Sequence, residues 1–98
     1  MLTKYFESEL NKKTVPEVSD NTGRYKMWDD GGTEAEVGEF LYGMVRILKP
    51  EHILETGLYS GISASYMAEG IKDNSSGDLM SIELSAEHIR TARERLAA

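Results

Sequence analysis

The amino-acid sequence predicts the opening part of a doubly wound α/β domain with the order helix, strand, helix, strand, helix. Two short and only partly apolar runs, residues 52–56 and 79–83, are too short for helices and are typical of strands in a parallel sheet. Helical patterns precede, separate and follow these runs, and a glycine-bearing turn comes directly after the first. Strands that alternate with helices form a parallel sheet through right-handed crossovers. Two strands are too few to complete such a sheet.

The chain divides near Gly31 and Gly32 into a polar lead and an ordered body. A short helical pattern spans residues 3–12, and Pro16 and a polar stretch over residues 19–23 then indicate a loop. From Thr33 onward the signals are stronger. We therefore expect a polar lead over residues 1–32 and a partial α/β domain over residues 33–98.

The first helix of the ordered body is predicted to begin at Thr33. Thr33 and Glu36 have the spacing of a capping box, in which each side chain satisfies a free backbone amide at a helix start. Pro50 ends the run. The predicted core-facing side consists of apolar residues at spacings of three and four: Val37, Phe40, Leu41, Met44, Val45 and Leu48.

The second and third helices follow the two strands. Ser85 is predicted to cap the third helix, because its hydroxyl can accept a hydrogen bond from a free amide of the first turn. Their predicted core-facing residues are Ala64, Met67, Ala68 and Ile71 in the second helix, and Ile89, Ala92 and Leu96 in the third.

Composition excludes several classes of protein. The 98 residues contain 11 lysines and arginines against 17 aspartates and glutamates, and this net charge of -6 argues against a nucleic-acid partner. No stretch approaches the roughly 20 apolar residues of a membrane span. Without cysteine, neither a disulfide nor a thiolate metal site can form, and a cytoplasmic location is the default expectation. A homo-oligomer is compatible with the sequence.

The turn after the first strand carries the strongest functional signal. A ligand at the carboxyl end of a parallel strand lies close to the backbone, and Gly57 and Gly61 leave that space free of side chains. Exposed amides at the start of the next helix can add polar contacts. Glu83, at the end of the second strand, borders the same crevice and can accept two hydroxyl hydrogens.

The segment Ile53-Leu54-Glu55-Thr56-Gly57-Leu58-Tyr59-Ser60-Gly61-Ile62-Ser63 resembles the first motif of class I S-adenosylmethionine-dependent methyltransferases. Its second half is similar to the loop of caffeoyl-CoA and catechol O-methyltransferases. The resemblance spans about residues 33–96 and implies a Rossmann-like fold, S-adenosylmethionine as cofactor and a small-molecule acceptor.

The resemblance also implies site residues. Glu55 would face the amino group and sulfonium of S-adenosylmethionine, and Glu83 would hold both ribose hydroxyls. Ser60 and Ser63 would lie near the methionine end, and Thr33 would reach the cofactor carboxylate. Tyr59 is equally compatible with packing and with cofactor contact. No residue of this chain is predicted to be catalytic or to bind metal.

In the resembling families, adenine is bound after the third strand, and the catalytic base or a divalent metal site comes after the fourth. The resemblance therefore implies that these elements would lie downstream of Ala98. We therefore expect the chain to be the amino-terminal part of a methyltransferase and to be inactive alone. A structural role is the expectation for His52 and His88, and packing is preferred over a lid for Trp28.

Two alternatives remain open. A nicotinamide-dependent oxidoreductase would carry the fingerprint G-x-G-x-x-G, which requires glycine where Tyr59 stands. Glu55 would also repel a pyrophosphate. A non-catalytic interaction module could use the same fold.

Overall fold

The computed structural model describes residues 8–13, 15, 26–29 and 31–97. The elements are α1 (Glu9–Lys12), α2 (Ala35–Leu48), β1 (His52–Thr56), α3 (Ile62–Asn74), β2 (Asp78–Ile82) and α4 (Ala86–Ala97). From α2 onward the order helix, strand, helix, strand, helix is the predicted one. Of the helix expected over residues 3–12, the described part has only α1, which begins at Glu9 after the extended N-cap Ser8, and residues 3–7 lie outside the described part.

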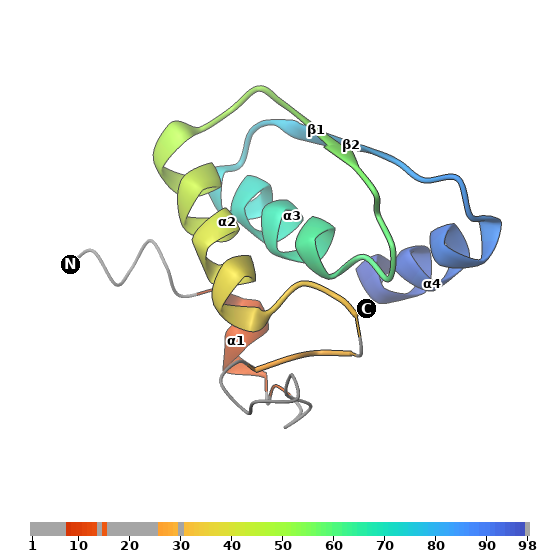
Figure 1. Ribbon diagram of the computed structural model, residues 1–98. Coiled ribbons are helices and arrows are strands. Elements are labelled where there is room, and N and C mark those ends of the chain that lie inside the picture. Colours follow the sequence, from red (N-terminus) through yellow and green to blue (C-terminus); the bar gives the residue numbers. More distant parts are fainter. Residues whose placement is uncertain (1–7, 14, 16–25, 30, 98) are drawn as a thin grey trace.

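The two strands form a parallel sheet, as predicted. Leu54 pairs with Met80, and Thr56 pairs with Ile82. β1 has the predicted bounds, whereas β2 begins and ends one residue earlier than the sequence indicated, so Glu83 lies just beyond its carboxyl end. In Figure 1, α2, α3 and α4 all lie on one side of the strands. On the opposite face, the side chains of Leu54 and Met80 are 66% and 65% exposed.

One hydrophobic cluster lies between α2, α3 and the amino-terminal segment, and a second joins Leu58, Ala64 and Ala92. Tyr66 of α3 is fully buried and packs with Tyr42 and Ile62, against which Trp28 also packs. The Trp28 indole Nε1 donates a hydrogen bond of 2.9 Å to the Tyr66 hydroxyl, and that hydroxyl donates to the side chain of Asn11. Burial raises the pKa of Tyr66 to about 12. The packing role expected for Trp28 is therefore confirmed.

The predicted core face of α2 is largely wrong. Phe40 is 55% and Leu48 is 65% exposed, and Val37 and Met44 are exposed as well. Of the predicted face, Val45 is buried and Leu41 is partly buried. The side of α2 that packs inward consists mainly of small residues and one tyrosine: Ala35, Gly38, Tyr42, Gly43 and Val45.

Close helix contact explains this outcome. A Cβ atom on Gly38 would overlap the ring of Tyr66, and a Cβ on Gly70 of α3 would lie 2.8 Å from Val45 Cγ1. The two helices thus approach each other where side chains are absent. Hydrophobic periodicity predicts that the most apolar side of a helix packs inward. In α2 the inward side is instead the one that contains Gly38, because only a residue without a side chain leaves room for the Tyr66 ring.

Gly38→Ala is expected to destabilise the chain by about 1–3 kcal/mol, the usual cost of overpacking a core. The fully buried Tyr66 ring has little room to move away from the new methyl group. Urea denaturation measures the change. Helix propensity alone predicts the opposite sign, a gain of about 1 kcal/mol. A stabilised variant would therefore contradict the close α2–α3 contact.

The predicted helix caps have different outcomes. α2 begins at Ala35 with Glu34 as its N-cap and no side-chain cap, so the capping box at Thr33 is wrong. The Glu36 carboxylate instead accepts hydrogen bonds of 3.2 Å from the Lys26 amide. The Ser85 cap is confirmed, because its hydroxyl accepts a 3.2 Å hydrogen bond from the His88 amide. None of the described helices has the length and apolar composition needed to cross a membrane.

Candidate functional site

A glycine turn over residues 57–61 joins the carboxyl end of β1 to the start of α3. Gly57 and Gly61 have φ values of 80° and 86°, a region that favours glycine. Tyr59, between them, also has a positive φ of 46°. The Gly57 amide donates to the Ile82 carbonyl at 2.9 Å, and the Gly61 amide donates to the Leu58 carbonyl at 3.0 Å. These bonds hold the turn at the carboxyl edge of the sheet.

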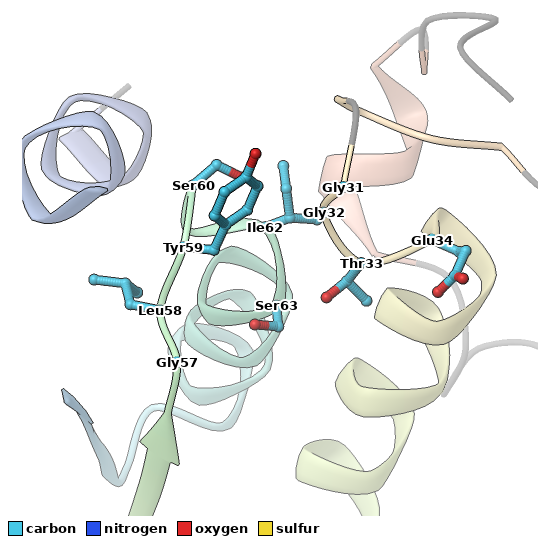
Figure 2. A pocket seen from close by; sticks show the side chains of 10 residues that line it. All are labelled: Gly31, Gly32, Thr33, Glu34, Gly57, Leu58, Tyr59, Ser60, Ile62 and Ser63. Carbon is cyan, nitrogen blue, oxygen red and sulfur yellow. The ribbon is translucent and has the colours of Figure 1, made fainter. Parts of the chain in front are cut away.

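A pocket of about 320 Å³ opens beside this turn. Its two walls come from separate parts of the chain, residues 57–63 on one side and residues 31–34 on the other (Figure 2). In that view the Thr33 hydroxyl points across the pocket toward the wall that carries Ser63. The lining residues are Gly31, Gly32, Thr33, Glu34, Gly57, Leu58, Tyr59, Ser60, Ile62 and Ser63.

Glu55 is joined to the pocket through Ser63. The Ser63 hydroxyl donates to Glu55 Oε2, and the Ser81 hydroxyl donates to Glu55 Oε1 at 2.9 Å. Glu55 lies on the partly buried face of β1, which faces the helices. The carboxylate is thus held by two hydroxyls, and Glu55 is not among the residues that line the pocket.

The Glu83 carboxylate connects the glycine turn to the start of α4 through hydrogen bonds. Its Oε1 accepts the Tyr59 amide at 2.8 Å, and its Oε2 accepts the Ser85 amide at 3.0 Å. The amide of Ser85, followed by that of Tyr59, lowers the pKa of Glu83 below its usual value, because both bonds favour the ionised carboxylate. His88 Nδ1 lies 3.7 Å from Glu83 Oε2, and the His88 ring packs edge-on against Tyr59 with centroids 4.8 Å apart.

The sequence model of a protein family described as O-methyltransferase matches residues 6–97 of the chain. The chain belongs to this family. A solved structure, the SAH-bound methyltransferase PaMTH1 of Podospora anserina, matches with 25% sequence identity and a TM-score of 0.64. The match covers 98% of this chain and 35% of that one, so the chain spans about a third of its length. Comparison with curated proteins gives no match.

These matches confirm the predicted Rossmann-like fold, since the elements of the chain correspond to part of a methyltransferase fold. They do not favour the oxidoreductase alternative. The family assignment rests on the whole matched range. The functional role of each site residue stays a prediction.

The predicted site residues occupy three kinds of position. Thr33, Gly57, Tyr59, Ser60 and Ser63 line the pocket directly. Glu55 and Glu83 reach it through hydrogen bonds to Ser63 and to the Tyr59 amide. Gly61 does not line the pocket, although its neighbours Ser60 and Ile62 do.

A side chain at Gly61 would contact the rest of the protein and would not extend into open space. A Cβ atom at Gly61 would lie 2.9 Å from the Ala92 Cβ of α4. A Cβ at Gly57 would have no neighbour within 4 Å. Only Gly57 therefore leaves free space beside the pocket, and Gly61 allows α4 to pack against the turn.

Several residues of the pocket carry no signal in the sequence. Gly31, Gly32 and Glu34 line the second wall beside Thr33. They lie more than 20 positions before the glycine turn, so the sequence does not show that the two segments come together. Asp29 and Arg95, 66 positions apart, approach each other to 3.4 Å next to the pocket walls. Within the described residues, no three acidic, histidine or cysteine side chains form a group that could hold a metal ion.

Proposed function

We propose that the pocket between residues 31–34 and 57–63 binds S-adenosylmethionine for the transfer of a methyl group to an oxygen of a small molecule. The observation that carries the proposal is the glycine turn at the carboxyl end of β1, which opens on the pocket and is hydrogen-bonded to the acid that follows β2. The family assignment supports it. The SAH-bound state of the Podospora anserina methyltransferase supports the choice of ligand.

The two ends of the ligand would meet different residues. Ser63 and Glu55 would accept hydrogen bonds from the α-ammonium group of the ligand. The Glu55 carboxylate is negative and is held in place by the hydroxyls of Ser63 and Ser81. Thr33, on the opposite wall, would donate to the ligand carboxylate. Gly57 would let the ligand approach the backbone.

Glu83 would hold the ribose hydroxyls. Its two oxygens accept the amides of Tyr59 and Ser85, and a carboxylate has about four lone-pair sites, so hydroxyl donors can still be accommodated. The amides of Tyr59 and Ser85 keep the carboxylate ionised and fix its orientation. Tyr59 and Ser60 would complete the wall of the pocket beside the glycine turn.

When bound, S-adenosylmethionine supplies an electrophilic methyl group, whose transfer to an acceptor oxygen breaks the carbon–sulfur bond and leaves S-adenosylhomocysteine. The described residues would bind and orient the donor, and orientation is a large part of catalysis in such a displacement. We assign no catalytic base and no metal ligand to them. The acceptor, a divalent metal, a cytoplasmic location, a homo-oligomer, the absence of a nucleic-acid partner and the boundary near residue 32 stay predictions.

Titration of the chain with S-adenosylhomocysteine tests the proposal. We expect calorimetric binding, and we expect Ser63→Ala to weaken it by roughly three- to tenfold, because one hydrogen bond contributes about 0.5–1.5 kcal/mol. Ser76→Ala, in the exposed loop before β2, is the matched control and should bind like the unaltered chain.

Absence of binding by the unaltered chain would overturn the proposed function. Equal affinities of Ser63→Ala and Ser76→Ala would remove Ser63 from the site. A parallel titration with NADH separates the dinucleotide alternative, for which we expect no binding.

A further inference from the structure

Arg95 of α4 contacts residues that belong to, or directly support, both walls of the pocket. Its Nε donates a hydrogen bond of 2.9 Å to the carbonyl oxygen of Ser60, in the glycine turn. Its Nη2 lies 3.4 Å from Asp29 Oδ2. Asp29 adjoins the other wall, since a Cβ atom on Gly32 would overlap its Oδ1. One guanidinium group therefore connects residues 57–63 to the segment that contains residues 31–34.

The packing of α4 fixes where this guanidinium lies. Ala92, three residues before Arg95 and thus on the same side of the helix, is fully buried against Gly61. The side chains of Arg95 and Asp29 are 31% and 27% exposed, so solvent screens their interaction less than that of a fully exposed pair. A planar guanidinium can donate in two directions at once, which a lysine ammonium on a flexible stem does less well.

We propose that Arg95 is a positioning residue that sets the separation of the two walls of the S-adenosylmethionine pocket. This inference rests on the proposed function. In that function Thr33 lies on one wall and Ser63 on the other, and both must reach the amino-acid end of the same ligand. The walls also approach each other where Gly31 lies near the Tyr59 ring and Gly32 lies near Ile62, and the Trp28–Tyr66 hydrogen bond adds a contact farther from the turn. Arg95 differs from these contacts because it joins the backbone of the turn to the carboxylate of Asp29.

Substitutions can distinguish the contact of Arg95 with Asp29 from its hydrogen bond to Ser60. Asp29→Asn keeps the size of the side chain and removes its charge, while the bond from Arg95 to the Ser60 carbonyl stays available. Arg95→Lys keeps a positive charge for Asp29 but loses the forked donor. Arg95→Gln removes the charge and shortens the side chain. Arg93→Gln makes the same change on an exposed position of α4 and is the matched control.

The experiment measures the dissociation constant for S-adenosylhomocysteine by calorimetry and the unfolding midpoint of each variant in the 98-residue chain. We expect Arg95→Gln to weaken binding roughly tenfold relative to Arg93→Gln, about 1.4 kcal/mol. We expect intermediate losses for Arg95→Lys and Asp29→Asn. The double variant Arg95→Gln/Asp29→Asn should bind no more weakly than Arg95→Gln alone, because both changes break one connection.

The fluorescence of Trp28, the chain's single tryptophan, gives a readout that stability alone would not move. Trp28 precedes Asp29, so we expect acrylamide to quench it more strongly in folded, ligand-free Arg95→Gln than in folded Arg93→Gln. If Arg95→Gln does not fold, Arg95→Lys and Asp29→Asn carry the same comparison.

Affinity in Arg95→Lys, Arg95→Gln and Asp29→Asn within twofold of Arg93→Gln would overturn the inference while leaving the proposed function in place. Additive losses in the double variant would overturn the connection through Asp29. Failure of the unaltered chain to bind S-adenosylhomocysteine would instead overturn the proposed function and this inference with it.

Discussion

Gly57→Val is expected to abolish S-adenosylhomocysteine binding, with a loss of more than about a hundredfold in affinity. Two effects add at this position. The φ of 80° strains any residue with a Cβ atom, at a typical cost of about 1–3 kcal/mol, and a branched side chain would fill the space through which a ligand approaches the backbone. Because a Cβ at Gly57 has no neighbour within 4 Å, we expect the helical circular dichroism spectrum to be retained.

Gly57→Ala separates strain from obstruction. Alanine carries most of the same backbone strain with a smaller side chain, so its affinity should fall between those of the unaltered chain and Gly57→Val. Gly61→Val should behave differently and lose folded structure, because its side chain would enter the contact with Ala92. Retained affinity in a folded Gly57→Val variant would refute the role of the turn in ligand approach.

Glu83→Ala should weaken S-adenosylhomocysteine binding by roughly ten- to a hundredfold, the scale for hydrogen bonds to a charged group. The carboxylate would lose its bonds to the ribose, and the glycine turn would lose the acceptor of the Tyr59 amide. Calorimetry measures the loss. Glu87→Ala, at an exposed position in the first turn of α4, is the control. An affinity of Glu83→Ala equal to that of Glu87→Ala would dismiss Glu83 as a ligand residue.

The lowered pKa of Glu83 adds a signature in the pH dependence of stability. Its folded-state pKa lies below the ordinary value of 4.5, because the Ser85 and Tyr59 amides favour the ionised form. The stabilisation is therefore present above pH 4.5 and is lost as the pH falls through the folded-state pKa. Urea denaturation across this range should show a smaller acid-dependent loss for Glu83→Gln than for Glu87→Gln.

The order of elements and the position of the glycine turn could be predicted because their signals are local. Residues 52–56 form a partly apolar run between Pro50 and Gly57, and the structure has a strand with those bounds. Ser85 caps α4 because a serine hydroxyl can reach an amide three residues later without help from the rest of the fold.

The face of α2 could not be predicted in the same way. Its apolar stripe remains exposed, and Gly38 faces inward because Tyr66, 28 positions later, occupies the space beside it. Thr33 fails as a cap for a similar reason. Met27 pairs with Glu34 in an isolated antiparallel bridge, and Glu34 becomes the N-cap of α2.

The sequence by itself determined the α/β order and the turn that resembles a methyltransferase motif, because both depend on residues that are neighbours in the chain. The parallel pairing of the strands followed from that order, since a strand, a helix and a strand in succession form a parallel pair. Only the tertiary structure decided that Gly31, Gly32 and Glu34 join Thr33 in the second wall of the pocket. It likewise decided that Gly61 serves the packing of α4 and that Arg95 contacts both Ser60 and Asp29. The contacts of Gly61 and Arg95 join positions that are 31 to 66 residues apart in the sequence, and the pocket joins two separate segments of the chain. Close packing selects such partners by shape and distance, and a single sequence carries no local signal for them.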